Sequence, residues 1–442
     1  MNKRFLASIL TATLGISMLT GCSNNKGTTV EIITELKEPV SIEMWHYLTG
    51  KQAETLDSII EDFNNNNGMG ITVKGVNQGN ITDLNKKVIT ASQSNSLPAI
   101  INVYPDIATG LINQGKIIDL SPYVNDANVG MKDDISNDFY KTFIDEVSQW
   151  KKDAVYGIPM TKSTEVLYVN KTLLEKLGYK VDDLKDLTFE KLAEISKKAN
   201  DELGIPGFGF DSSSNAFIST LKEDGKDFIA SDGKINVDND WVKSFMEYFK
   251  DEVQSGSFRI PGEDKYLSGP FSNQKILTYQ GSSAGAAHIK TDGAFEVEVV
   301  EVPVFKDKSK AVIQQGASLF VTSDVTSEAQ FAAYEFIKYA TNTENTAKFA
   351  VATGYLPVRK SASDTAVMKD ALNDQVGLFA KIYPVAQKSL EYAYFTPAIN
   401  NAQSARNIVQ EKYDAYVSGS IKDIDTFIKD TTSQVETSIQ RQ

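Results

Sequence analysis

From residue 41 onward, the chain alternates stretches with strand character and stretches with helix character. Residues 41–45 alternate polar and apolar side chains, as a half-buried strand does. The apolar side chains that follow have the i, i+3, i+4, i+7 spacing of one helix face: Leu56, Ile59, Ile60 and Phe63. The polar run 64–68 predicts the end of that helix. A strand, a helix and a strand are predicted next, over 71–76, 83–92 and 99–104.

The same alternation restarts after Gly157. Strand character is found at 165–170, 295–304 and 318–322, and helix character at 171–177, 189–203 and 237–249. An amphipathic helix carrying Phe331 and Ile337 follows, and the last hundred residues read as mostly helical. Strands and helices in alternation predict right-handed crossovers and a largely parallel sheet. We therefore expect two α/β lobes with a cleft between them.

The first residues have the pattern of a signal peptide. Lys3 and Arg4 precede a mainly apolar run from Phe5 to Leu19, which is short for a membrane span. The run ends in Leu-Thr-Gly and then Cys22, an order that resembles a bacterial lipobox. Cys22 is the single cysteine of the chain, so it has no disulfide partner. We expect cleavage after residue 21, a lipid on Cys22, and a tether over 22–40 that holds the protein at the extracytoplasmic face of the membrane.

Length and charge narrow the classes of function. A chain of 442 residues is longer than a single domain with one hydrophobic core usually is, and 41% hydrophobic residues are enough for substantial cores. The net charge of −13 argues against a nucleic-acid partner, because phosphate contacts need a basic face. It does not exclude a small anionic ligand, since one local arginine outweighs a distant acidic surface.

The usual catalytic motifs are lacking, with one exception. The chain has two histidines, His46 and His288, and neither a His-Glu-x-x-His motif nor a phosphate-binding Gly-x-x-x-x-Gly-Lys-Ser/Thr loop, so we expect no metal site and no cofactor. Residues 281–285 do match the Gly-x-Ser-x-Gly pattern, with Ser283 as the nucleophile. The downstream histidine is only five residues away, and no acid lies between the two. A binding loop is therefore favoured over a serine hydrolase, and we expect no enzyme.

Five stretches together resemble one family. They are residues 43–46, 97–104, 163–171, 316–320 and 354–359. Their order and spacing resemble the family-1 extracellular solute-binding proteins, which serve mainly carbohydrate ABC importers. Within that family the likeness is greatest to the glycerol-3-phosphate-binding proteins. The resemblance implies the two-lobed periplasmic-binding-protein fold of type II, with the ligand in the cleft and hinge crossovers between the lobes.

The resemblance also implies a phosphate-binding set. The residues that match are Ser163, Ser282 or Ser283, Gly316, Tyr355 and Arg406. Their chemistry suits an oxyanion, because arginine binds phosphate bidentately and the hydroxyls and the glycine amide are neutral donors. The polyol end departs from the pattern. Ile81 stands at the position of a tyrosine, Pro105 followed by Asp106 at that of an acid, and Ser212 and Asn215 near two tryptophans.

The expected function is capture of a small solute, followed by hinge closure and delivery to an ABC permease by a monomer. The solute is expected to be a phosphorylated polyol, with Asp106 accepting hydrogen bonds from its hydroxyls. A neutral sugar stacked on Trp45 and Tyr47 is the alternative, and an adhesin with no small ligand is a third. The first lobe is expected to comprise 41–162 and 279–316, and the second 163–278 and 317–442.

Overall fold

The computed structural model of the chain describes residues 32–374 and 377–440. The predicted signal peptide, residues 1–21, and the predicted lipidation site, Cys22, lie outside these ranges. No helix within the described ranges is both long enough and apolar enough to cross a membrane.

The elements follow one another as the alternation of patterns predicts. The strands are β1 (Val40–His46), β2 (Ile71–Asn77), β3 (Ile100–Val103), β4 (Gly157–Asn170), β5 (Phe208–Gly209), β6 (Phe258–Arg259), β7 (Thr278–Ser282), β8 (Val297–Val300), β9 (Val312–Val321) and β10 (Ala393–Tyr394). The helices are α1 (Lys51–Asn66), α2 (Ile81–Gln93), α3 (Pro105–Asn113), α4 (Ser121–Val124), α5 (Lys132–Asn137), α6 (Lys141–Val147), α7 (Lys171–Lys176), α8 (Phe189–Leu203), α9 (Ser213–Glu223), α10 (Asp240–Gln254), α11 (Ser268–Ser272), α12 (Ser327–Ala340), α13 (Thr343–Thr353), α14 (Ala366–Asn373), α15 (Leu378–Ser389), α16 (Ala402–Val417) and α17 (Ile424–Gln440). Short 3₁₀ segments are η1 (Val181–Leu184), η2 (Gly262–Asp264), η3 (Ser283–His288) and η4 (Lys360–Asp364).

The main sheet is mixed rather than largely parallel. Its strands lie in the order β2-β1-β3-β9-β4-β7, with β8 beside β4 and β10 beside β9. β1 runs parallel to β2 and β3, as expected from the crossovers α1 and α2. β9 is antiparallel to β3 and β4, and β4 is antiparallel to β7 and β8. The prediction of a largely parallel sheet was wrong because β9 enters the sheet from the opposite end.

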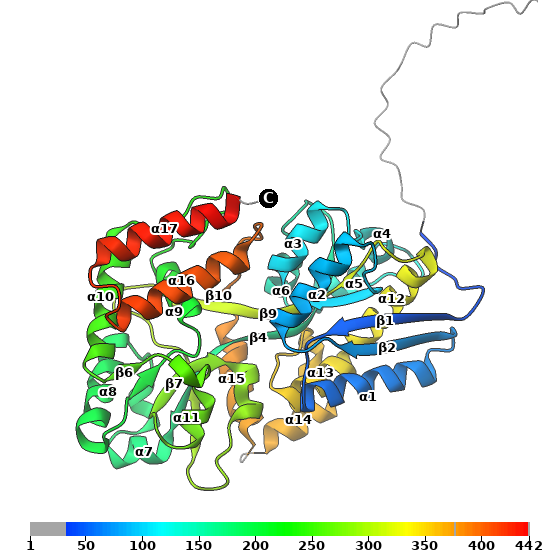
Figure 1. Ribbon diagram of the computed structural model, residues 1–442. Coiled ribbons are helices and arrows are strands. Elements are labelled where there is room, and N and C mark those ends of the chain that lie inside the picture. Colours follow the sequence, from blue (N-terminus) through cyan, green and yellow to red (C-terminus); the bar gives the residue numbers. More distant parts are fainter. Residues whose placement is uncertain (1–31, 375–376, 441–442) are drawn as a thin grey trace, which may run out of the picture. The chain divides into compact units, whose positions relative to one another are not determined.

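Two long strands join the lobes of this α/β fold (Figure 1). Residues 157–164 of β4 pair with β9, whose far end pairs with β3 in the first lobe. Residues 165–170 of β4 pair with β7 and β8 in the second lobe. The β4–β9 register shifts between Pro159 and Thr161, so the ladder is interrupted near the middle of the pair. The change from one lobe to the other therefore takes place inside a single pair of strands.

Helices cover both faces of the sheet. α1, α12 and α13 pack on one face of the first lobe, and α2 and α3 pack on the other. α8, α9, α10, α16 and α17 enclose the core of the second lobe. The predicted helix face is confirmed in α1, where the four spaced apolar side chains are all buried. Each such side chain contributes about 1.5–3 kcal/mol by leaving water.

Two segments make contacts that cross the expected division into lobes. β7 and β8 pair with residues 165–170 of β4, while their buried side chains, among them Tyr279 and Val297, belong to the same core cluster as those of α1. The helices between 327 and 353 pack against α1 and β1, so they belong to the first lobe. The chain returns to the second lobe at β10 and remains there through α16 and α17. Amphipathic patterns predicted these elements, but a pattern does not state which of two cores an apolar face covers.

The end of the expected tether also packs on the fold. The side chains of Ile32, Ile33 and Leu36 lie against the first-lobe core. The packed domain therefore begins several residues before the first strand.

Candidate functional site

The candidate site is built on one face of β4. Thr161, Ser163 and Glu165 alternate along the strand, so their side chains share one face of it. All three are buried, with exposed fractions of 3% or less. Polar side chains in such a position need hydrogen-bond partners, and elements from both lobes supply them.

The first lobe supplies two tyrosines. The Tyr47 hydroxyl, just past the end of β1, lies 3.3 Å from Thr161 Oγ1 and 3.4 Å from the Tyr355 hydroxyl. Tyr355 follows Gly354, which ends α13 in the left-handed conformation at φ 78°. A Cβ on Gly354 would lie 3.0 Å from the Ser283 carbonyl oxygen, so glycine allows this close approach. Burial raises the pKa of Tyr355, so the hydroxyl stays protonated and able to donate.

A chain of hydroxyls crosses the middle of the site. Ser282 Oγ donates to Ser163 Oγ over 3.1 Å, and Ser163 Oγ donates to Gln315 Oε1 over 3.4 Å. Ser282 ends β7, and Gln315 lies on β9. The two predicted serines are thus in direct contact, although they are far apart in sequence.

Glu165 receives three amide groups. Asn215 Nδ2 donates to Glu165 Oε1 over 2.6 Å, and Gln315 Nε2 donates to the same oxygen over 3.3 Å. Gln280 Nε2 donates to Oε2 over 2.8 Å. Burial raises the pKa of Glu165, and the hydrogen bonds from Gln280 and Asn215 and the charge of Arg406 oppose the rise.

Arg406 is attached to this network through Asn215. The guanidinium Nη2 of Arg406, in the second turn of α16, donates to Asn215 Oδ1 in the first turn of α9. The backbone of Asn215 is fixed there because Ser212 caps α9. The Ser212 hydroxyl accepts a hydrogen bond from the backbone N–H of Asn215 over 3.3 Å. Arg406 forms no ion pair with any residue in the described ranges.

The charge of Arg406 reaches the first lobe. Burial raises the pKa of Asp106 to about 6, Arg406 opposes this rise, and Glu146 adds to it. Asp106 lies in the first turn of α3, directly after Pro105 at the helix start. Arg406 also lowers the pKa of Tyr104 and Tyr394 against the larger effect of burial. The guanidinium therefore lies within electrostatic range of both lobes.

β4 and β9 pass together from one lobe to the other at residues 161–164 and 314–317, a stretch that we call the β4–β9 crossing. Gly316 lies within it. Its φ is 105°, and a Cβ there would lie 1.7 Å from the Thr161 carbonyl oxygen, so no other residue fits. The buried Lys162 donates to the Gly316 carbonyl oxygen over 3.0 Å and to Glu146 Oε2. Lys162 lies on the β4 face opposite to Thr161 and Ser163, so its ion pair with Glu146 stabilises the β4–β9 crossing on the face away from the candidate site.

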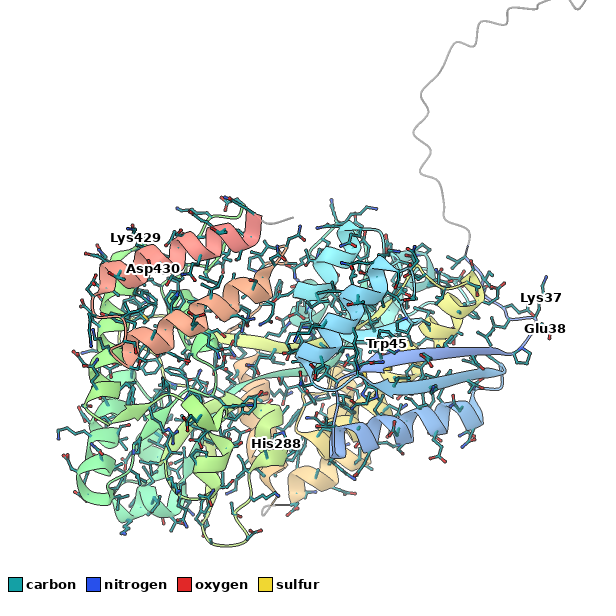
Figure 2. The ribbon with its side chains drawn as sticks, in the orientation of Figure 1. Lys37, Glu38, Trp45, His288, Lys429 and Asp430 are labelled. Carbon is teal, nitrogen blue, oxygen red and sulfur yellow. The ribbon has the colours of Figure 1, made fainter. Side chains whose placement is uncertain are left out.

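The structure brings together most of the residues predicted for binding. Ser163, Ser282, Tyr355 and Gly316 lie at the β4–β9 crossing, Arg406 is joined to it through Asn215 and Glu165, and Asp106 lies within electrostatic range of Arg406. Trp45 stays a prediction: its ring packs against the α2 and α3 cluster, which Tyr47 also contacts, and its Nε1 donates to Glu43 over 3.4 Å at the end of β1 (Figure 2).

Unlike Ser282, Ser283 does not take part in the described hydrogen-bond network of Ser163. Its side chain is fully buried, and its Oγ has no hydrogen-bond partner among the described residues. His288 is exposed on η3 (Figure 2). Among the described residues, therefore, no base is hydrogen-bonded to the Ser283 hydroxyl, as a nucleophilic serine would need.

Sequence reasoning did not select several residues of the site: Tyr104, Glu165, Gln280, Gln315 and Tyr394. Glu165 could have been noticed, because it directly precedes the apolar run 166–169 of a predicted strand, and a carboxylate is rarely buried in such a strand. The glutamines and tyrosines left none, since they stand in strands and loops where such residues are ordinary.

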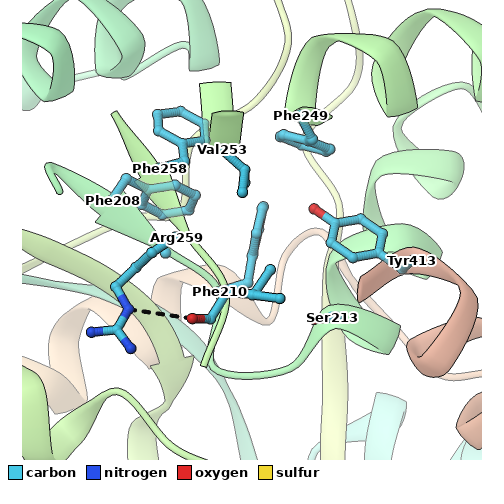
Figure 3. A pocket seen from close by; sticks show the side chains of 10 residues that line it. Phe208, Phe210, Ser213, Phe249, Val253, Phe258, Arg259 and Tyr413 are labelled. Atoms are coloured by element: carbon cyan, nitrogen blue, oxygen red, sulfur yellow. Dashed lines mark hydrogen bonds between the residues drawn. The ribbon is translucent and has the colours of Figure 1, made fainter. Parts of the chain in front are cut away.

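A mainly aromatic pocket lies in the second-lobe core (Figure 3). Phe208, Phe210, Phe249 and Tyr413 line it, together with Arg259. The Arg259 Nε donates to the Ile260 carbonyl oxygen over 3.2 Å, and its guanidinium pairs with Asp264. Because its charge is already paired, Arg259 is a useful contrast to Arg406.

The chain matches a family model described as "Bacterial extracellular solute-binding protein" over residues 58–374. It is similar to the sn-glycerol-3-phosphate-binding periplasmic protein UgpB of Rhizobium meliloti, with 22% identity over 395 residues, which cover 86% of this chain and 89% of that protein. UgpB of Shigella flexneri is 26% identical over 337 residues, covering 73% and 75%.

Solved structures share the fold. UgpB of Mycobacterium tuberculosis, in complex with glycerophosphocholine, aligns with a TM-score of 0.78 at 17% identity, covering 91% of this chain and 99% of that one. The cyclic alpha-maltosyl-1,6-maltose binding protein of Arthrobacter globiformis aligns with a TM-score of 0.76 at 18% identity, covering 92% and 100%.

Proteins of the matched family are substrate-binding proteins that hold small solutes outside the cytoplasm and deliver them to ABC permeases. The family model covers more than half of this chain, and the fold has the two lobes that such proteins use. The chain therefore belongs to the bacterial extracellular solute-binding proteins.

Proposed function

We propose that this protein captures a phosphorylated polyol, such as glycerol-3-phosphate or a glycerophosphodiester, and delivers it to an ABC permease as a monomer. The anionic group lies against Arg406, Ser163, Ser282, Tyr355 and the Gly316 amide. The hydroxyls of the polyol donate to Asp106. The protein is not an enzyme and needs no cofactor.

The observation that carries this proposal is the charge of Arg406, which forms no ion pair within the part of the chain that the structure describes. Arg259 pairs with Asp264, and Arg359 pairs with Asp134 and Asp138. Arg406 instead donates to the neutral carbonyl oxygen of Asn215, so most of its five N–H donors and its full charge remain available. An arginine fork held in this way suits the bidentate binding of a phosphate.

The serines can turn toward an anion at little cost. The Ser163 proton is used in a 3.4 Å hydrogen bond to Gln315, and the Ser282 proton in a 3.1 Å hydrogen bond to Ser163. Both contacts lie at the long end of the hydrogen-bond range, so a charged acceptor competes well for the two protons. The site therefore changes from a self-satisfied network to a set of donors when the anion arrives.

Groups from both lobes contribute, which favours capture by closure. Asp106 and Tyr355 come from the first lobe, Arg406 and Ser282 from the second, and Ser163 from the strand that joins them. A solute that bridges these groups binds the closed state better than the open one and shifts the population toward it.

A neutral sugar is the second candidate. Asp106 lies within electrostatic range of Arg406 and accepts from hydroxyls equally well, and the Arthrobacter globiformis relative is named for a sugar ligand. Titration calorimetry separates the two candidates. The soluble chain from Ser23 onward is titrated with glycerol-3-phosphate, with glycerophosphocholine and with maltose. Binding of either phosphate ester without maltose supports the proposal, whereas binding of maltose alone sinks the phosphate site and leaves the transport role.

We also propose that Cys22 carries a lipid that anchors the protein outside the cell membrane. The support is the Leu-Thr-Gly-Cys sequence and the lack of any other cysteine. Metabolic labelling with a radioactive fatty acid tests it in cells that express the full chain. Label on the wild type and none on Cys22→Ala is the expected result, and equal label on both contradicts the anchor.

A further inference from the structure

Glu165 holds the amides around it in one orientation. Its side chain is 2% exposed, and an ionised carboxylate has only acceptors. The amide atoms of Asn215, Gln280 and Gln315 that face it are therefore the NH₂ groups, at 2.6, 2.8 and 3.3 Å. All three are held by one residue that lies between them.

This orientation decides where the carbonyl oxygens of two of these amides lie. With its NH₂ group on Glu165, Asn215 presents Oδ1 to Arg406. With its NH₂ group on Glu165, Gln315 presents Oε1 to the Ser163 hydroxyl. If either amide rotated by 180°, it would present an NH₂ group to a guanidinium or leave the serine hydroxyl without its acceptor. Arg406 and Ser163 thus depend on the same carboxylate.

We infer that Glu165 is a positioning residue that never touches the solute and sets the geometry of Arg406 and Ser163 through Asn215 and Gln315. The inference rests on the proposed function for the identity of the bound group. It assigns Asn215 the role of a neutral holder, which fixes Arg406 without cancelling its charge. An aspartate at that position would pair with the guanidinium and remove the charge from the ligand.

A direct contact between Glu165 and the solute is disfavoured by the geometry. Oε1 already accepts two hydrogen bonds and Oε2 accepts one, and the side chain is buried beneath the amides that it orients. A carboxylate in contact with an anionic solute would also repel it.

The conservative substitution Glu165→Gln is accommodated by the network. The carbonyl oxygen of the introduced glutamine can take the place of Oε1 and keep the hydrogen bonds from Asn215 and Gln315. The NH₂ group of the introduced side chain then faces Gln280, whose own Oε1 is buried without a hydrogen-bond partner among the described residues. Rotation of the Gln280 amide brings that oxygen to the new donor. Glu165→Leu offers no acceptor, so the amides lose their orientation.

The test compares three variants with the wild type by titration with the best-binding solute of the panel. Glu165→Gln is expected to bind within about threefold of the wild type, or more tightly, because the orientation stays and a negative charge leaves. Glu165→Leu is expected to lose about tenfold to a hundredfold in affinity, the range for a lost hydrogen bond to a charged group. Thermal melting confirms that each variant is folded.

The third variant exchanges the acid and the amide. In Glu165→Gln with Asn215→Asp the net charge is unchanged, and the NH₂ group of the introduced glutamine can donate to the introduced aspartate, but a carboxylate now faces Arg406. We expect a folded protein with at least about tenfold weaker binding of a phosphate ester. If Glu165 were only structural, the exchange would restore binding together with folding. That result overturns the inference, as does wild-type affinity in Glu165→Leu or a tenfold loss in a folded Glu165→Gln.

The same variants separate this inference from the proposed function. If the wild type binds maltose and no phosphate ester, the proposed function fails, and the comparison of Glu165→Gln with Glu165→Leu is made with maltose. The positioning role then still predicts that Glu165→Gln binds maltose within about threefold of the wild type and that Glu165→Leu binds it at least about tenfold more weakly. Should both bind maltose equally well, the inference fails independently.

Discussion

The substitution Arg406→Ala tests the proposed anion site most sharply. Arg406 uses one N–H on Asn215 and has no ion pair among the described residues, so its main loss is expected in binding rather than in folding. Two charge-assisted hydrogen bonds to a phosphate are worth about 1.5–3 kcal/mol each, or about 3–6 kcal/mol together. The expected loss of phosphate-ester affinity is about 10²- to 10⁴-fold, at about 1.4 kcal/mol for each factor of ten.

The cost of the same substitution in stability is small. Asn215 Oδ1 loses its partner, which costs about 1–2 kcal/mol of unfolding free energy. Titration calorimetry measures the affinity, and urea denaturation measures the stability. Arg259→Ala is the matched control because it removes the same charge from a partly exposed ion pair with Asp264, which is worth about 0–1 kcal/mol. The reasoning is refuted if Arg406→Ala binds the ester like the wild type, or if Arg259→Ala weakens binding equally.

Three further predictions concern the crossing of the lobes and the acid of the first lobe. Gly316→Ala should destabilise the protein by about 2–4 kcal/mol in urea denaturation, because its Cβ would lie 1.7 Å from the Thr161 carbonyl oxygen, whereas Gly285→Ala, in open space, should stay within about 0.5 kcal/mol. Lys162→Met should lower the free energy of unfolding by about 3–5 kcal/mol, because it leaves Glu146 buried and unpaired. The double variant with Glu146→Leu should recover most of this loss in the same assay, and no recovery would contradict the ion pair. Burial raises the pKa of Asp106 from 3.8 to about 6, so ionisation of this carboxyl lowers the free energy of unfolding. The loss of stability is absent below about pH 4 and complete above about pH 6. Asp106→Asn should therefore flatten the dependence of stability on pH between 4 and 6 and be about 1–3 kcal/mol more stable than the wild type at pH 7, and an unchanged slope would count against the buried acid.

The sequence predicted the elements of this fold better than their partners. Apolar spacing located α1 and α8 to within a few residues, because each buries one face and has clear end signals. The spacing could not show that β9 enters the sheet antiparallel, or that α12 and α13 pack on the first lobe. Those facts depend on pairing and packing between residues that are far apart in the sequence, which a local pattern does not record.

The family resemblance, rather than residue type alone, selected Arg406 and Ser163 as candidates. The structure places Ser163 in contact with Ser282 and joins Arg406 to the same network through Asn215, which leaves their binding role a prediction. Trp45 was expected in the site because aromatic rings suit sugars, and this stays a prediction, since its ring packs against the same α2 and α3 cluster as Tyr47. The amides of Gln280 and Gln315 could not be predicted, because their role exists only once three strands bring them to Glu165.

A crystal structure of the soluble chain with its tightest-binding solute would decide most directly whether the β4–β9 crossing is an anion site. We predict an anionic group within hydrogen-bond distance of Arg406 and of the Ser163 or Ser282 hydroxyl, with polyol hydroxyls at Asp106 and Glu165 out of contact with the solute. A solute bound away from the β4–β9 crossing, or one at the crossing with no contact to Arg406, would contradict this prediction.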